Sequence, residues 1–304
     1  VLAGRLHPVS GPPIEDAAVL VRGGRIAAVG RRVDVKAPGN IPVVRASVVT
    51  PGLIDAHSVV PLSGEYNIPA DQDQDEKSDP NQAEVRVLDG FNPSEPLLRF
   101  LLQQGVTVIH ATPGRANVIG GLSGLFRTHG GDAEAMTVRF PQAVLFNLGV
   151  SPKQAYAEGK PTTRMGTASI IRAALAQAAD YAAKVAAAAD DRDTAAPERN
   201  LKHESLGLLL QKKIPAVFCA QRADDLLTAL RIAREFEIQP VLALAAEGYL
   251  VREQLAATKV PVIVHPTMQR VGGLETINSV LGNAATLADA RIPIAIGSGV
   301  EGYV

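Results

Sequence analysis

The stretch VVTPGLIDAHSVV, residues 48–60, sets the pattern for most of the chain. A Pro-Gly turn leads into an apolar run that ends on Asp55 and His57, which predicts a β-strand with polar side chains at its end. A second histidine two residues on would lie on the same face and complete a metal-binding pair, but that position is Val59. The stretch predicts a strand and poses the question of a metal site.

Downstream of this strand, short apolar runs alternate with helix-like segments such as 166–189 and 224–237. The runs resemble buried parallel strands because they are brief, often β-branched, and introduced by Gly or Pro. With the first strand at 52–57, the predicted strands are 105–110, 143–148, 214–219, 239–244, 260–265 and 292–297. An eighth is expected between 149 and 213, so the pattern favours a (β/α)8 barrel over an open sheet.

Upstream of the barrel, residues 1–47 predict β-structure. The segment 17–30 contains two apolar runs separated by Gly23-Gly24, which is a hairpin signal. The chain is therefore divided into a small β-portion, 1–47, and a barrel, 48–304.

Composition narrows the class of protein. The 304 residues, 46% hydrophobic and 20% charged, are typical of a globular protein, and the net charge of −1 gives no reason to expect nucleic acid or an anionic membrane as partner. Cys219 is the single cysteine, which excludes an internal disulfide and a cysteine-rich zinc site. No apolar run is long enough to span a bilayer, and both a cytoplasmic and an exported location stay open.

Several motifs resemble the amidohydrolase superfamily, in particular its imidazolonepropionase-like and prolidase-like branch. They occur in the expected order over nearly the whole chain: GGRIAAVG, TPGLIDAH, DQDQDE, RVLDGFNPSEPLLRFLLQQGVTVIHATPGRANVIGG, QRADDLLTALRIAREFEIQPVLALAAEGYL and GNAATLADARIPIAIGSG. The resemblance implies a (β/α)8 barrel with a small β-sandwich built from both chain ends. Because the chain stops at Val304, soon after the last predicted strand, the C-terminal part of that fold is expected to be absent.

The resemblance also implies hydrolysis of amide or cyclic amide C–N bonds by metal-bound water. The implied ligands are two histidines on the first strand, one on each of two middle strands, and an aspartate on the last strand that also acts as general base. Here His57 is kept, and the other matching positions hold different residues, namely Val59, Cys219 or Gln221, Leu244 and Gly299. His57 and Cys219 are the only candidate ligands at these positions.

Two further histidines end predicted strands, His110 and His265. With His57 and Cys219 they can be combined into a new site for one divalent metal such as zinc. The alternative is that each lines a pocket or the core with a satisfied hydrogen bond, and this alternative is favoured, so no cofactor is expected.

Candidates for ligand binding follow several strands. The glycine-rich segment 113–131, interpreted as a loop at the barrel mouth, contributes Arg115, Asn117 and Arg127, whose side chains suit a carboxylate or phosphate. Arg222 and Glu247 follow two later strands and complete the set with His110 and His265.

Three functions remain. The favoured one is an amidohydrolase-family barrel that is catalytically impaired or repurposed to bind a small-molecule ligand at its mouth. The second is an active amidohydrolase with an unusual single-metal site. The third is a non-catalytic subunit that pairs with an active paralogue or forms a homo-oligomer.

Overall fold

The N-terminal unit of the computed structural model, Val1–Leu53, is a four-stranded sheet; the model describes residues 1–191, 193–265 and 273–298. Its strands are β1 (Leu2–Leu6), β2 (Ile14–Arg22), β3 (Arg25–Arg31) and β4 (Arg45–Val49), in the order β3-β2-β1-β4. The predicted hairpin is confirmed: β2 and β3 are antiparallel, and Gly23 and Gly24 turn between them with φ of 54° and 72°.

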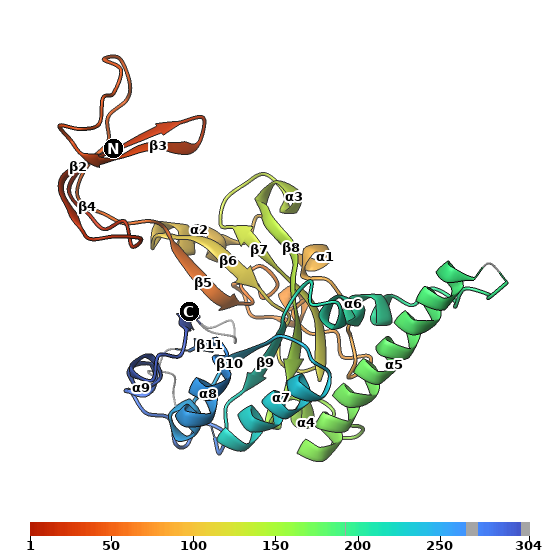
Figure 1. Cartoon of the computed structure of the whole chain (residues 1–304). Coiled ribbons are helices and arrows are strands. Elements are labelled where there is room, and N and C mark those ends of the chain that lie inside the picture. Colours follow the sequence, from red (N-terminus) through yellow and green to blue (C-terminus); the bar gives the residue numbers. More distant parts are fainter. Residues whose placement is uncertain (192, 266–272, 299–304) are drawn as a thin grey trace. The chain divides into compact units, whose positions relative to one another are not determined.

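The second unit, from Ile54 onward, is built on an eight-stranded sheet (Figure 1). The strands lie in sequence order across the sheet: β5 (Leu53–Ser58), β6 (Val106–Ala111), β7 (Ile119–Arg127), β8 (Thr137–Asn147), β9 (Ala216–Ala220), β10 (Pro240–Leu244), β11 (Val262–Val264) and β12 (Ile294–Ile296). The ends of the sheet meet through Asp55 on β5, which accepts hydrogen bonds from the backbone N–H of Ser298 at 2.8 Å and from its hydroxyl. The predicted barrel is confirmed.

The eighth strand is β7, which lies inside the glycine-rich segment that the sequence analysis interpreted as a loop. β7 is antiparallel to both β6 and β8, whereas β8 to β12 are parallel. The expectation of a strand between 149 and 213 was wrong, because the described part of that segment forms three helices with turns and irregular backbone between them and no strand. The loop interpretation of the glycine-rich segment was wrong for Ile119–Arg127.

The glycines of β7 serve close packing within the sheet. Gly121 has a φ of 111°, and a Cβ at this residue would press against the backbone oxygen of Val85. A Cβ on Gly124 would meet the rings of Phe126 and Phe140. The register with β8 shifts at several points along this strand, as expected where bulges interrupt a ladder.

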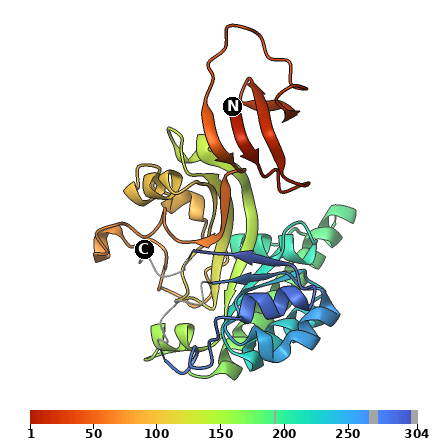
Figure 2. The same cartoon turned by 90° about the vertical axis from the view of Figure 1, so that its left-hand side faces the viewer.

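Helices follow the strands and cover the sheet (Figures 1 and 2). They are the 3₁₀ turns η1 (Pro69–Asp71) and η2 (Gly248–Val251) and the helices α1 (Val87–Gly90), α2 (Pro96–Gln103), α3 (Ala133–Met136), α4 (Val150–Ala155), α5 (Arg164–Asp190), α6 (Leu201–Leu210), α7 (Ala223–Glu235), α8 (Arg252–Thr258) and α9 (Asn283–Asp289). Within the described residues, no helix combines the length and apolarity that a membrane crossing requires.

Strand alternation divides the buried residues of β8 to β11 between two apolar clusters. On β9, Phe218 packs in the larger cluster with helix residues such as Leu175 and Leu226, and its ring stacks on Phe146 of β8 at 5.0 Å between centroids. Its neighbour Cys219 points to the other face. That face forms a second cluster inside the barrel, called the inner cluster below, whose buried members are Val59, Ala143, Leu145, Val217, Cys219, Ala243, Leu244 and Ile263.

Candidate functional site

His57 lies at the end of β5 and is fully buried. Its Nδ1 is 3.2 Å from Nε2 of His265, and its Nε2 is 4.0 Å from Sγ of Cys219. Three of the sequence candidates are therefore brought together, from strands far apart in the chain, at the C-terminal ends of β5, β9 and β11.

Burial keeps these side chains neutral at neutral pH. It lowers the pKa of His57 well below its ordinary value and that of His265 to about 4, and it raises the pKa of Cys219 to about 12. The positive charge of Arg115 lowers both histidine pKa values further and opposes the rise at Cys219. Arg115 therefore creates a positive potential at this end of the barrel.

His110 at the end of β6 has hydrogen-bond partners outside this group. Its Nδ1 lies 3.0 Å from the backbone oxygen of Ala56, which can only accept, so Nδ1 carries the proton. Its Nε2 lies 2.8 Å from the Ser123 hydroxyl, which is also 3.2 Å from the backbone oxygen of Ala143. Both ring nitrogens of His110 have hydrogen-bond partners within the protein. This matches the interpretation of His110 as a pocket or core residue instead of a metal ligand.

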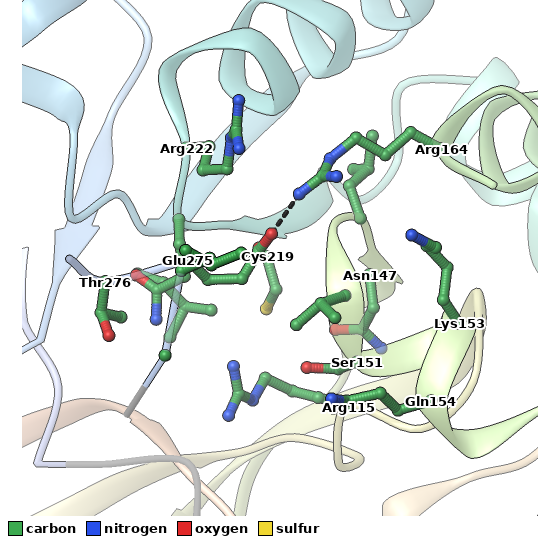
Figure 3. A pocket seen from close by; sticks show the side chains of 16 residues that line it. Arg115, Asn147, Ser151, Lys153, Gln154, Arg164, Cys219, Arg222, Glu275 and Thr276 are labelled. Atoms are coloured by element: carbon green, nitrogen blue, oxygen red, sulfur yellow. Dashed lines mark hydrogen bonds and ion pairs between the residues drawn. The ribbon is translucent and has the colours of Figure 1, made fainter. Parts of the chain in front are cut away.

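A cavity of about 510 Å³ opens at this end of the barrel (Figure 3). Arg115, from the connection between β6 and β7, and Cys219 both line it. The remaining lining residues come from the end of β8 and α4, the start of α5, the ends of β9 and β10, and the segment before α9: Asn147, Leu148, Val150, Ser151, Lys153, Gln154, Arg164, Gln221, Arg222, Leu244, Gly273, Leu274, Glu275 and Thr276.

An ion-pair cluster forms one wall of this cavity. Arg164, the first residue of α5, donates to Asp225 of α7 at 2.9 Å and also pairs with Glu275, as drawn in Figure 3. Asp225 is buried, and burial raises the pKa of both carboxyl groups while the Arg164 charge opposes the rise. The cluster links α5, α7 and the segment before α9 around the cavity.

The other predicted ligand-binding residues have mainly structural contacts. Asn117 is buried and accepts a hydrogen bond from the hydroxyl of Tyr156 at 2.6 Å. Glu247 is buried and accepts from the backbone of Ala223 and the side chain of Asn278, each at 2.8 Å.

Two arginines of the predicted set differ in position. Arg222 lines the cavity and donates to Asp224 at 3.0 Å. Arg127 is exposed, and it is the last residue of β7. Because β7 runs antiparallel to β6, Arg127 lies opposite Val108 in the sheet, nearer the start of β6 than its end. It therefore lies away from the mouth, contrary to the placement expected for a loop residue.

One solved structure to which the chain is similar is a crystal structure of an amidohydrolase from Thermotoga maritima MSB8. The two chains superpose with a TM-score of 0.89 and are 33% identical, and the match covers 96% of this chain and 76% of that one. The chain belongs to the amidohydrolase superfamily. The motifs quoted from the sequence predicted this membership, and it is confirmed at the level of the superfamily.

A curated amidohydrolase, tasK from Hapsidospora irregularis, is 27% identical over 235 residues. That match covers 69% of this chain but only 24% of the relative, so the chain spans about a quarter of that protein's length. No family model matches the chain.

The described residues of this chain do not fit the metal centre that the family resemblance implies. Among residues 1–191, 193–265 and 273–298, no three His, Cys, Asp or Glu side chains are grouped closely enough to hold a metal ion. His57 directs different nitrogens at His265 and Cys219, so one ion cannot bind to the ring and to both neighbours. Gly299 lies outside the described residues.

Residues that could not be identified from the sequence supply much of the cavity lining. Lys153 and Ser151 lie in α4, Arg164 opens α5, and Glu275 lies between β11 and α9. No spacing or motif marks them, because their positions depend on how the helices pack around the barrel. The end of β8 was predicted as an apolar strand. The polar Asn147 within it was the one local sign that this strand end lines a cavity.

Proposed function

We propose that this barrel has lost the metal-activated water of its family and binds a small-molecule ligand at its mouth. One observation carries the proposal. Val59, Cys219 and Leu244, which occupy positions where the resemblance implies metal ligands, pack together in the inner cluster. Valine and leucine offer no lone pair to a cation, so these positions contribute apolar packing instead of coordination.

The acidic residues at the mouth support the same proposal. Asp55 is buried, and its carboxylate accepts hydrogen bonds from the backbone of His57 at 3.2 Å and from Ser298. Glu275 is paired with Arg164. Each described carboxylate near the site thus has a structural role, whereas a general base needs access to the proton it removes.

The cavity at the barrel mouth is suited to a small-molecule ligand. The cavity has the size of ordinary small-molecule sites and combines apolar side chains with convergent polar groups. Leu244 at its edge has a left-handed backbone, with a φ of 75°, which is unusual for a leucine. The end of β10 thus has a constrained backbone conformation at Leu244, although the Leu244 side chain is apolar.

Hydrolysis assays test the loss of chemistry. Wild-type protein and His57→Ala are incubated with a panel of N-acyl amides and cyclic amides, with added zinc or with a chelator, and amine release is measured. We expect the wild type to release amine no faster than the variant under any condition. Turnover that is lost on chelation, restored by zinc and abolished by His57→Ala would overturn the proposal.

A further inference from the structure

The connection between β11 and α9 borders the cavity at the barrel mouth. Its described part, residues 273–282, is called the strap below. Four consecutive strap residues, from Gly273 to Thr276, line the cavity, and Figure 3 shows the side chains of Glu275 and Thr276 among the lining groups. A movement of the strap therefore changes the opening of the cavity.

Apolar burial contributes little to holding the strap in place. All four of its large apolar side chains are exposed, with 77% for the first and 76% for the last: Leu274, Ile277, Val280 and Leu281. Two of its backbone hydrogen bonds close local turns inside the strap, from Thr276 to Gly273 and from Ser279 to Thr276. A segment with few buried apolar contacts opens at a low cost in free energy.

Glu275 ties the strap to the helices beside the cavity. Its carboxylate pairs with Arg164, the first residue of α5, and the backbone N–H of Val150 in α4 also stabilises the charged form. The approach is close, because a Cβ on Gly149 would press against this carboxylate. Only 15% of the Glu275 side chain is exposed, so water and salt screen the pair less than a surface pair.

The bond between Glu275 and Arg164 can be released without stranding the arginine. Arg164 also donates to the buried carboxylate of Asp225 at 2.9 Å. Burial raises the pKa of Glu275, and the neighbouring negative charge of Asp225 raises it further, whereas the charge of Arg164 opposes the rise. When Glu275 leaves, Asp225 stays with the arginine, so no buried charge is left unpaired.

Asn278 makes a second tether, away from the cavity. Its side-chain amide donates to Glu247 at 2.8 Å, and its backbone oxygen accepts from the hydroxyl of Tyr249 at 3.0 Å. Asn278 is not among the described residues that line the cavity. A change at Asn278 can therefore loosen the strap without altering the cavity wall itself.

We propose that the strap is a lid, held closed by Glu275 and Asn278, whose release admits the ligand to the cavity. The inference deepens the proposed function and rests on it, because it assigns the control of entry to the same site.

Cys219 reports entry into the cavity, because it is the single cysteine, lines the cavity and is buried. N-methylmaleimide and N-(1-pyrenyl)maleimide are both neutral, and each adds a thiol across the same carbon–carbon double bond, but the second is much wider. The rate of the wide reagent is divided by that of the narrow one, which cancels the fraction of thiolate. We expect this ratio to be far lower in the folded wild type than in the urea-unfolded chain.

Two variants release the lid without enlarging the cavity. Glu275→Gln keeps the size of the side chain and removes its charge, and Asn278→Asp places a second carboxylate against Glu247. Each should raise the ratio about tenfold, because each weakens a hydrogen bond to a charged partner. Glu253→Gln removes an exposed carboxylate on α8 and should leave the ratio unchanged.

Global unfolding would also admit the wide reagent, so stability is matched. The wild type is measured in the concentration of urea that brings its free energy of unfolding down to that of each variant. We expect both variants to exceed the matched wild type. Equal ratios at equal stability, or an equal rise in Glu253→Gln, would overturn the proposal.

Limited proteolysis measures the strap without using the thiol. Thermolysin cleaves before large apolar residues such as the exposed Leu274, Ile277 and Leu281, and mass spectrometry maps the cut sites. We expect faster cleavage within 273–282 in both variants than in the matched wild type. A higher ratio without faster cleavage there places the opening elsewhere and refutes the lid. That result leaves ligand binding standing, whereas zinc-dependent turnover defeats the proposed function and leaves the lid standing.

Discussion

Acid should destabilise the barrel through His110. Its Nδ1 donates to the backbone oxygen of Ala56 and its Nε2 lies 2.8 Å from the Ser123 hydroxyl, in a buried position where a charged ring would lose its hydration. Burial lowers the pKa of His110 from its ordinary 6.5 to about 4. Between these two values the unfolded chain binds a proton that the folded barrel does not, so stability falls as the pH drops through this window.

The size of the effect follows from the two pKa values. At about pH 4.5 the unfolded ring is almost fully protonated, whereas much of the folded ring is still neutral. With about 1.4 kcal/mol for each pH unit, this one side chain lowers the free energy of unfolding by about 2 kcal/mol relative to neutral pH.

Urea unfolding of the wild type and His110→Gln at about pH 7 and pH 4.5, followed by far-ultraviolet circular dichroism, measures this difference. The variant should be less stable at neutral pH but lose about 2 kcal/mol less on acidification. His129→Gln changes an exposed histidine in the connection after β7 and should behave as the wild type. If His110→Gln and the wild type lose equal stability, the reasoning about this buried ring is refuted.

Other substitutions test the packing of the barrel. Gly121→Ala should lower the free energy of unfolding by at least about 1 kcal/mol, because φ is 111° and the added methyl meets a backbone oxygen; an unchanged urea midpoint would contradict this. Ser298→Ala should cost about 1–3 kcal/mol, since it removes a donor to the buried carboxylate of Asp55, whereas Ser298→Thr keeps the hydroxyl and should cost less. Leu145→Ala should cost about 2–5 kcal/mol by opening a void in the inner cluster; a loss below about 1 kcal/mol in thermal unfolding would show that this cluster is loosely packed.

Parallel strands buried on both faces could be predicted from the sequence. Such strands are continuous apolar runs: β10 and β11 lie within the predicted ranges, and β9 passes its range by one residue, Ala220. β12 also lies within its range, although its residues are exposed. β7 could not be found in this way. Its Gly120, Gly121 and Gly124 give it the composition of a loop. Gly121 nevertheless makes room for the backbone oxygens of Gln82 and Val85, and Gly124 makes room for two phenylalanine rings. The missing strand was therefore sought in a segment that forms α4, α5 and α6.

The candidate site could be predicted only in part from the sequence. His57, His110, Cys219 and His265 were combined as one candidate group because parallel strands end at one rim. His57, Cys219 and His265 do lie together, whereas His110 has its contacts with Ala56 and Ser123. Which ring nitrogen faces which neighbour depends on rotamers, and this decides whether a metal can be shared. Lys153 and Glu275 come from α4 and from the segment before α9, so their place in the cavity is set by tertiary packing that no local pattern encodes.

The metal content of the purified protein tests the central claim most directly. Wild-type protein and Cys219→Ala are loaded with zinc, dialysed against metal-free buffer and analysed by mass spectrometry for bound metal per chain. The inner cluster offers no set of three ligands among the described residues, so we expect far less than one zinc per chain in both proteins. One tightly held zinc per wild-type chain, lost in Cys219→Ala, would contradict the account.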